Sequence, residues 1–330
     1  MSRILVTGAG AVLGQGIIKS LRSGGSGWEI IAADPNPLSV GLYWADQACL
    51  IPMASDPAYA DAIEDLLEVL RPHAVLVGTD VELAIFASRR EEWERRFATR
   101  ILVSDPETIE IADDKYATAR FLARHGLDHP LSALPEDAEG LEFLIDRVGF
   151  PLIVKPRRGA RAVGVSLVSD RADLALALTG RSGLVVQQLA GPDDQEYTAG
   201  VLFFEDEVKA SIVLRRDLRD GNTYRAFVGE YPDCDAYVRS VAEALRPYGP
   251  ANFQFRKGAD GRCRLFEINA RFSGTTPMRA LAGFNEVDLC LRHLLHGKAV
   301  PPCKARPGVI LRFLDEQFIA ADHLISAGAS

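Results

Sequence analysis

The spacing of apolar segments changes near residue 106, and this change constrains the fold more than any other feature of the sequence. Before that point, short apolar segments alternate with longer segments of helical periodicity, which is typical of βαβ units and a parallel sheet. The expected strands are residues 3–7, 29–33, 74–78 and 100–104, and the expected helices are residues 12–23, 56–70 and 82–97. We therefore predict an N-terminal α/β domain of residues 1–108.

From residue 109 onward the pattern predicts a different architecture. Beyond residue 196, longer strands follow one another, which favours an antiparallel sheet in an α+β body. These strands are expected at residues 197–204, 207–214, 225–230, 251–257 and 262–269. We predict a second domain of residues 109–305 with a lid subdomain near 120–190, then a C-terminal strand and tail of residues 306–330.

Composition and charge exclude several classes of protein. The 330 residues are 48% hydrophobic and carry a net charge of −8, from 37 basic and 45 acidic residues. A net negative chain lacks the basic footprint of a nucleic-acid-binding protein. No apolar run reaches the roughly 18 residues of a membrane span, and the N-terminus is unlike a signal peptide. Five scattered cysteines without a Cys-x-x-Cys pair predict a reduced, cytoplasmic protein with no structural zinc.

A glycine-containing turn separates the first expected strand from the first helix, with Gly8, Gly10 and Gly14 in the pattern. Such glycines allow a tight turn and a close approach to a phosphate at the helix N-terminus. Asp34 ends the second strand, where a ribose-binding acid would lie. The pattern leaves open an extended short-chain dehydrogenase or epimerase using NAD(P), or a turn with no ligand. The dehydrogenase alternative lacks its Tyr-x-x-x-Lys pair, because no tyrosine has a lysine four residues later.

A polar cluster lies on the last two long strands. Because side chains alternate along a strand, Glu267, Asn269 and Arg271 share one face. Residues 257–261 suit a hairpin turn, which sets Gln254 almost opposite Glu267. Carboxylate and amide oxygens of this kind suit Mg²⁺ that also binds nucleotide phosphates. A solvated polar face is the alternative.

Two lysines upstream fit the same chemistry. Lys155 ends the apolar strand 151–155, and the loop 156–164, rich in arginine and small residues, follows it. A lysine beside such a loop is one way to hold nucleotide phosphates. Lys115 begins a helix directly after two aspartates. A solvated loop and an ordinary surface lysine are the alternatives.

Taken in order, six motifs resemble those of the ATP-grasp enzymes, above all the branch of the carbamoyl-phosphate synthase large chain and biotin carboxylase. The motifs are Lys115, residues 154–156 with the following loop, 185–189, 196–198, 252–255 and 266–271. The resemblance covers about residues 3–300 and implies an ATP-grasp fold preceded by a Rossmann-like domain with a parallel sheet. Two departures stand out: loop 157–164 has three arginines and only two glycines, and the chain holds one synthetase module, so it is not a carbamoyl-phosphate synthase.

The resemblance implies that ATP is a cofactor and assigns residues to it. Lys115 and Lys155 would contact its α- and β-phosphates, and the loop would close over them. The remaining ATP-binding residues would be Gly159 and Gly164 in the loop, Gln187, Gln188 and Leu189 around the adenine, and Glu196 at the ribose.

The resemblance also implies a metal site and a catalytic pair. Gln254, Glu267 and Asn269 would hold Mg²⁺ (or Mn²⁺) at the β- and γ-phosphates. Arg271 would stabilise a phosphorylated carboxylate, with Lys155 as the second catalytic residue. The reaction would be an ADP-forming ligation of a small carboxylate to an amine through an acyl phosphate.

The sequence also offers candidates for substrate recognition, for which a surface or structural role is the alternative. Asp80 and Glu82 would bind an ammonium group, and the arginines an anionic group. The full set of candidates is Gly8, Gly10, Asp80, Glu82, Arg215, Arg225, Ser273 and Gly274. The expected partners are small molecules, with neither nucleic acid nor membrane, and a homodimer stays open. Besides the dehydrogenase, the remaining alternative is a non-catalytic regulatory protein that binds ATP.

Overall fold

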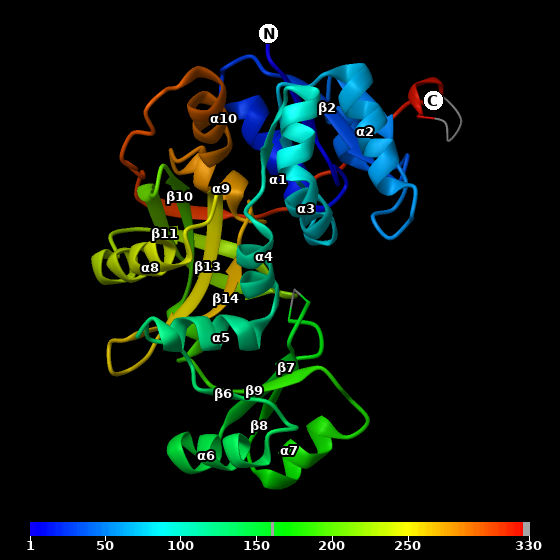
Figure 1. Cartoon of the computed structure of the whole chain (residues 1–330). Helices are drawn as coiled ribbons and strands as arrows, with labels where there is room; N and C mark the ends of the chain where they lie inside the picture. The colour runs from blue at the N-terminus through cyan, green and yellow to red at the C-terminus, as the bar shows by residue number, and fades with distance from the viewer. Residues whose placement is uncertain (160–161, 326–330) are drawn as a thin grey trace.

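A computed structural model describes residues 1–159 and 162–325 (Figure 1). Its N-terminal part is a five-stranded parallel sheet in the order β3-β2-β1-β4-β5. The strands are β1 (Arg3–Val6), β2 (Glu29–Asp34), β3 (Gln47–Leu50), β4 (Ala74–Leu76) and β5 (Arg100–Leu102). Four of them match the sequence-based expectation. Strand β3 was missed because it lies at the sheet edge, where its side chains are only partly buried and its apolar signal is weak.

Three helices accompany this sheet, namely α1 (Val12–Ser23), α2 (Tyr59–Leu70) and α3 (Asp80–Phe97), together with a short 3-10 helix, η1 (Val40–Trp44). Helix α1 buries Ile17, Ile18 and Leu21, and α2 buries Ile63 and Leu67. These positions recur with the helical period that the sequence displays. The predicted parallel α/β architecture is therefore confirmed.

Two short helices, α4 (Pro106–Asp113) and α5 (Lys115–Arg124), lead from this part to the rest of the chain. The sequence pattern predicts a helical segment over 112–126 in which Lys115 begins a helix, and α5 does begin at Lys115, whereas residues 112 and 113 belong to α4. The Asp114 carboxylate accepts hydrogen bonds from the backbone N–H of Tyr116 (2.9 Å) and Ala117 (3.3 Å). Asp114 is therefore the N-cap of α5, because a side-chain oxygen satisfies N–H groups that lack an intrahelical partner.

The lid is a four-stranded antiparallel sheet in the order β6-β9-β7-β8, covered by two helices. Its elements are β6 (Ser132–Ala133), α6 (Ala138–Val148), β7 (Leu152–Pro156), β8 (Ser166–Val168), α7 (Arg171–Leu178) and β9 (Leu184–Gln188). Leu144, Leu152, Val154 and Val186 belong to an apolar core that the lid does not share. The lid lies at the bottom of Figure 1, far from the N-terminal sheet at the top.

The body is a six-stranded antiparallel sheet in the order β14-β13-β10-β11-β12-β15. Its strands are β10 (Glu196–Phe204), β11 (Glu207–Arg219), β12 (Asn222–Val228), β13 (Gly249–Lys257), β14 (Cys263–Asn269) and β15 (Gly308–Leu311). Its helices are α8 (Pro232–Leu245), α9 (Thr276–Leu281) and α10 (Glu286–His296), with short 3-10 helices η2 (Asp193–Gln195) before β10 and η3 (Ala321–His323) in the tail. The antiparallel body is thus confirmed.

The C-terminal segment returns from the body to the N-terminal part (Figure 1). It pairs β15 with β12 at the edge of the body sheet. Farther along, the backbone N–H of Ile325 donates to the hydroxyl of Tyr43 at 3.3 Å. Residues 326–330, the end of the predicted tail, lie outside the described residues.

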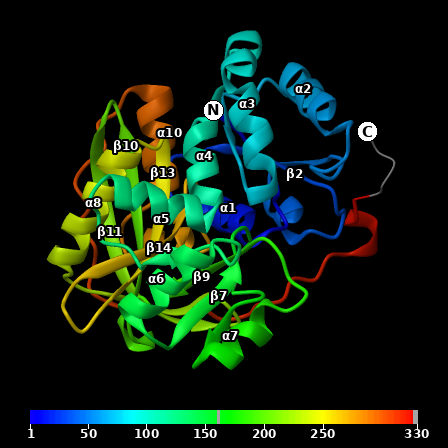
Figure 2. The same cartoon turned by 60° about the horizontal axis from the view of Figure 1, so that its bottom comes forward.

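The body and the N-terminal part share one apolar core. Leu5 and Phe86 belong to the same buried cluster as Phe253, Leu265 and Ile268. Figure 2 shows α4 and α5 between these parts and the lid. The site described below therefore lies between a rigid two-part base and a lid with its own core. No helix within residues 1–159 and 162–325 is long and apolar enough to span a membrane.

Candidate active site

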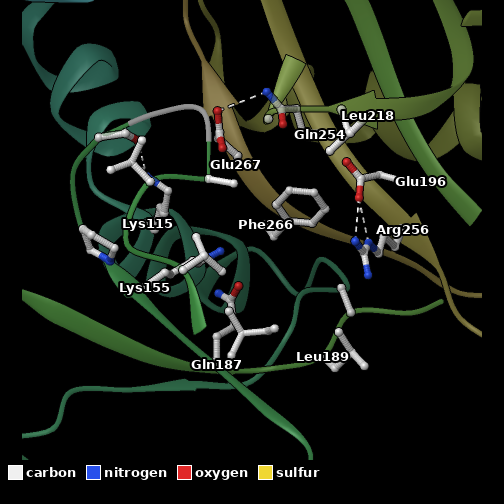
Figure 3. A pocket seen from close by; sticks show the side chains of 18 of the residues that line it. Lys115, Lys155, Gln187, Leu189, Glu196, Leu218, Gln254, Arg256, Phe266 and Glu267 are labelled. Carbon is white, nitrogen blue, oxygen red and sulfur yellow. Dashed lines mark hydrogen bonds and ion pairs between the residues drawn. The ribbon is translucent and has the colours of Figure 1, made fainter. Parts of the chain in front are cut away.

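Three cavities meet at the end of β14, and Glu267 lines all of them. The first cavity lies between the lid and the body and is shown in Figure 3. The second cavity lies between the body and the N-terminus of α1. The third cavity lies between β14, α3 and α4. A group bound at Glu267 is therefore accessible from three sides.

The first cavity contains a buried lysine. Lys155 lies on β7, and because its neighbour Val154 faces the lid core, Lys155 faces the cavity. Its ammonium nitrogen lies 5.3 Å from the centre of the Phe266 ring. Burial lowers the pKa of Lys155 to about 7, although Glu267 acts in the opposite direction. A bound anion would favour the charged form of this side chain.

A second lysine anchors the loop that closes the cavity. The Nζ of Lys115 donates to the carbonyl oxygen of Gly159 at 2.7 Å, and its backbone N–H donates to the carbonyl oxygen of Arg157 at 2.9 Å. Lys115 and Gly159 both line the cavity. Gly164 does not line it, and its carbonyl oxygen accepts from Arg181 instead. Ala160 and Arg161 of the predicted loop lie outside the described residues.

Two arginines of this loop, Arg157 and Arg158, are paired with acids of the two connecting helices. Arg157 donates to Asp114, with 3.2 Å between Nε and Oδ1. Arg158 pairs with Glu110 and lies 3.3 Å from the Oδ2 of Asp113. From the sequence alone, Arg157 and Arg158 look like unpaired positive charges, because the sequence does not show that α4 and α5 bring carboxylates beside them.

The segment at the end of β9 forms the far wall of the first cavity, where Gln187, Gln188 and Leu189 line it. Their side chains are partly engaged within the lid. The Nε2 of Gln187 donates to the Oγ of Ser132 at 2.9 Å, and the Oε1 of Gln188 accepts from the backbone N–H of Leu131 at 3.2 Å. These contacts fix the wall against which a flat ring would lie.

Glu196 is buried in the first cavity between two arginines. Arg216 donates from Nε and Nη2 to its Oε1, at 3.1 and 2.7 Å. Arg256 donates from Nε to its Oε2 at 2.8 Å (Figure 3). A ribose hydroxyl at Glu196 would join this network rather than meet a lone carboxylate. Sequence reasoning did not link either arginine to Glu196, although Arg256 shares the strand face of Gln254.

The polar row predicted on β13 and β14 is present. Gln254 pairs with Glu267 across the two strands, as the hairpin predicts. The side-chain amide groups of Gln254 and Asn269 donate to the Oε1 of Glu267 at 3.0 and 3.1 Å. Gln254 and Glu267 line both the first and the second cavity. The row therefore forms the boundary between the two.

Arg271 ends the row and connects the body to the N-terminal part. It donates to both carboxylate oxygens of Asp80, at 2.6 and 2.9 Å, and to the Oδ1 of Asn269 at 2.8 Å. Asp80 is the first residue of α3, where the helix dipole favours a negative charge. Both residues line the second cavity, and Asp80 also lines the third.

Three family models match parts of this chain. They are described as a PylC-like N-terminal domain (residues 4–100), a RimK-like ATP-grasp domain (residues 112–242), and an ATP-grasp of a biosynthetic pathway with the Ter operon (residues 181–316). The second and third together span the lid and the body. The chain belongs to the ATP-grasp superfamily.

Individual relatives are distant. The carbamoyl phosphate synthase large chain of Methanosarcina acetivorans is 25% identical over 305 residues, which cover 83% of this chain but 28% of that protein. A crystal structure of the ADP complex of purK, an N5-carboxyaminoimidazole ribonucleotide synthetase, matches with a TM-score of 0.76 and 17% identity, over 94% of this chain and 81% of the other. An L-amino acid ligase of Bacillus licheniformis matches with a TM-score of 0.65 and 18% identity, over 93% and 78%. The predicted ATP-grasp fold is confirmed.

The metal-ligand set of this ATP-grasp chain fits an ion that is shared with a nucleotide. Within the described ranges, no group of three His, Cys, Asp or Glu side chains could hold a metal. The row offers a single carboxylate, Glu267, and two amides that at present donate to it. Mg²⁺ is commonly held by one or two carboxylates together with substrate phosphates. The amide oxygens of Gln254 and Asn269 accept from Arg216 and Arg271. The row therefore fits Mg²⁺ once phosphates complete its ligands and these oxygens are released to the ion.

The glycine turn of the ATP-grasp chain is closed by its own hydrogen bonds. The N–H of Ala9 donates to Ala33, that of Ala11 donates to Gly8, and that of Gly10 donates to the Oδ2 of Asp34 at 2.7 Å. These are the groups that a dinucleotide phosphate would need. Asp34, the expected ribose ligand of a dehydrogenase, instead holds the turn. The family assignment and this geometry both oppose the dehydrogenase alternative.

Four of the candidate substrate residues, Gly8, Glu82, Arg215 and Arg225, do not line any of the three cavities. Glu82 is buried beneath Gly8 and accepts hydrogen bonds from the hydroxyls of Thr7 and Thr79, each at 2.8 Å. Arg215 packs against Phe227 and, like Arg225, pairs with Asp217. Because side chains alternate along β11, Arg215 and Arg216 point to opposite faces, and only Arg216 faces the site.

The remaining candidates, Gly10, Ser273 and Gly274, line the second cavity. Ser273 and Gly274 belong to the loop that follows Arg271. A fully buried arginine, Arg279, supports this loop, and the sequence analysis did not identify it. Arg279 forms an ion pair with Glu286 at 2.7 Å and donates to the Oγ of Ser273 at 2.9 Å. Nothing in the local sequence marks this pair, because it depends on how α9 and α10 pack against the sheet.

Proposed function

We propose that this chain is an ATP- and Mg²⁺-dependent ligase that joins a small carboxylate to an amine and releases ADP and phosphate. The chain spans 28% of the length of the carbamoyl phosphate synthase that it matches, so its activity is proposed from its own site. The observation that carries the proposal is the polar row of Gln254, Glu267, Asn269 and Arg271, which divides a lysine-lined cavity from a second, polar cavity.

In this proposal the first cavity holds ATP. Lys155 and Lys115 would bind its phosphates, and the end of β9 would contact the adenine. Glu267, with Gln254 and Asn269, would hold Mg²⁺, which when bound neutralises charge on the transferring phosphoryl group. The lid has an apolar core separate from that of the base, which supports closure over the nucleotide without disruption of either core.

The second cavity would hold the carboxylate. An oxygen of that carboxylate attacks the γ-phosphorus, the bond from this phosphorus to the bridging oxygen breaks, and ADP leaves. The amine nitrogen then attacks the acyl carbon, loses a proton and expels phosphate. Arg271 lines the second cavity and donates to Asn269 of the row, and from there it would stabilise the charge on the acyl phosphate.

Asp80 would recognise the amine. It lines both the second and the third cavity and contacts Arg271 directly. An ammonium group beside Asp80 would therefore lie next to the acyl group, and once it has lost a proton its nitrogen can attack that group. An amino acid as the amine is supported by the resemblance in fold to an L-amino acid ligase.

Nucleotide binding provides the first test. Mg-ATP should raise the melting temperature, whereas NAD(P)H should not, since a ligand that binds only the folded state stabilises it. The reverse result would reject the ligase and restore the dehydrogenase. ADP formation should then be screened over pairs of carboxylates and amines, because dependence on both substrates separates a ligase from a non-catalytic ATP-binding protein.

The Glu267→Gln variant provides the second test. The change keeps the size of the side chain and removes the single carboxylate of the row, so it should abolish ADP formation and weaken the Mg²⁺ dependence of ATP binding. Glu205→Gln is the matched control, because Glu205 lies on the surface and pairs with Lys209. Unchanged ADP formation in Glu267→Gln would refute the metal assignment.

A further inference from the structure

The second cavity contains an arginine that neither the motifs nor the proposed reaction uses. Arg312 directly follows β15 and lines the cavity. Its backbone N–H donates to the carbonyl oxygen of Tyr224 at 2.9 Å, and its Nη2 donates to the carbonyl oxygen of Gly274. Both the backbone and the guanidinium are therefore held in place.

Arg312 differs from the other arginines of this cavity in its charge balance. Arg216 pairs with Glu196 and Arg271 pairs with Asp80. Among residues 1–159 and 162–325, no carboxylate forms an ion pair with Arg312. Burial lowers the pKa of Arg312, and no neighbouring acid counteracts this effect. A partly buried cation without a counter-charge is costly, and an anionic ligand would remove that cost.

The surroundings of Arg312 also favour an anion. The second cavity includes Ser273 and Thr223, whose hydroxyls can donate, and residues 10–13 at the start of α1. The N-cap of α1, Ala11, has no side chain that could bond to the first N–H groups of the helix. These N–H groups and the helix dipole add positive potential at the same end of the cavity.

Arg312 is close to the proposed acyl site. Arg271 donates to the carbonyl oxygen of Phe272, and Arg312 to that of Gly274. Phe272 and Gly274 are two residues apart, so their carbonyl groups are separated by at most about 7 Å. This distance is comparable to the length of a small metabolite. A single ligand can therefore contact both arginines.

We propose that Arg312 binds an anionic group, a carboxylate or a phosphate, which the substrate carries in addition to the carboxylate activated at Arg271. This inference rests on the proposed function and specifies its substrate class. The acyl substrate is a dianion, with its second charge near Gly274, rather than a simple monocarboxylic acid.

Direct binding tests this proposal without turnover. The full chain, saturated with Mg²⁺ and a non-hydrolysable ATP analogue, is titrated calorimetrically with succinate, glutarate, adipate and 4-phosphonobutyrate. Butyrate, pentanoate and hexanoate serve as monoanions of matched length. The same series is run on Arg312→Gln, Arg312→Lys and Arg306→Gln. Arg306 is the control because it is exposed and donates to the carbonyl oxygen of Leu281 outside the three cavities.

We expect at least one dianion to bind wild-type protein at least tenfold more tightly than its matched monoanion, or about 1.4 kcal/mol. Arg312→Gln should remove this preference, Arg312→Lys should restore part of it, and Arg306→Gln should keep it. A stronger preference for 4-phosphonobutyrate than for glutarate identifies a phosphate, and the reverse identifies a carboxylate.

Two results would overturn the proposal. One is that no dianion binds more tightly than its monoanion, and the other is that Arg312→Gln keeps the preference. Affinity for the ATP analogue within twofold of wild type shows that each variant is folded. Failure of the ligase proposal is seen separately, as absence of nucleotide binding or of ADP formation with every substrate pair.

Discussion

Two glycine-containing segments of this chain look like loops that bind nucleotide phosphates, and only one of them borders the cavity proposed for ATP. In the turn at residues 8–14, the N–H groups of Ala9, Gly10 and Ala11 are bound within the turn or to β2 and Asp34. The loop at 156–164 instead borders a cavity that contains Lys115 and Lys155. Glycines in a sequence indicate a backbone conformation. Whether an anion can bind depends on whether the backbone N–H groups are free to donate and whether cations lie nearby.

Lys155→Gln would test the cavity that the loop at 156–164 borders, and it should have the largest effect on ADP formation. Loss of one preorganised donor to charge that develops in the transition state, here on the phosphates of the leaving ADP, costs about 10²–10³-fold in kcat. The free energy of unfolding should stay equal or rise, because a buried ammonium is removed. The measurements are ADP formation with an active substrate pair and urea unfolding.

Lys209→Gln is the control for this variant, since Lys209 pairs with Glu205 and Glu207 outside the cavities. Equal losses of activity in both variants would show that Lys155 has no special part in the reaction.

Gly10→Ala would test the turn side. An added Cβ would lie 2.1 Å from the Oγ of Ser39, which must shift. Overpacking of this kind lowers the free energy of unfolding by about 1–3 kcal/mol, while the affinity for an ATP analogue should not change. Gly159→Ala should instead lower the affinity for the ATP analogue, because a φ of +117° is strained for alanine and the loop would have to move. Its effect on the free energy of unfolding should be the smaller one, because the added Cβ would meet open space. A large loss of nucleotide affinity in Gly10→Ala would give the turn a binding role.

The pH dependence of nucleotide affinity would show whether Lys155 acts as a cation. Its pKa of about 7 leaves half of the side chains charged at pH 7. About one in eleven is charged at pH 8, so the affinity should fall about fivefold over this interval. Binding should also take up a proton, measurable by calorimetry in buffers of different ionisation enthalpy. Lys155→Gln should abolish both effects, and a pH-independent affinity in wild type would contradict the assignment.

Arg158→Gln should have the smallest effect and refines the description of the loop. Arg158 lines the first cavity and is paired with Glu110 and Asp113 at the surface. Loss of exposed pairs should change the free energy of unfolding by no more than about 1 kcal/mol. If the guanidinium turns to the phosphates on binding, the affinity for the ATP analogue should fall roughly two- to fivefold. Unchanged affinity would mean that the arginine serves only to hold the loop against α4.

The sequence predicted the regular elements well where burial imposes a period. Lys155 and Glu267 were placed correctly on their strands, because alternation with Val154 and Ile268 shows which side faces a core. The start of a helix at Lys115 was also predicted, and the structure shows Asp114 as the N-cap of that helix. Strand β3 was missed because a half-exposed edge strand has no clear apolar pattern.

The charge partners could not be predicted. Arg271 lies 191 positions from Asp80 in the sequence, and the pair forms because α3 and the end of β14 meet across the base. The same applies to Glu82, which is held by hydroxyls of Thr7, Tyr59 and Thr79 and is closed off from substrate.

Arg312 is the clearest example of the difference between sequence and structure. In the sequence it is one arginine in a C-terminal segment without a motif, and only the pairing of β15 with β12 brings it to the second cavity. The sequence by itself determined the row on β13 and β14, because side chains alternate along strands, and its six ordered motifs implied the ATP-grasp fold through their resemblance to that family. Only the tertiary structure decided which charges are paired, because ion pairs form between elements that are distant in the chain and meet only after folding.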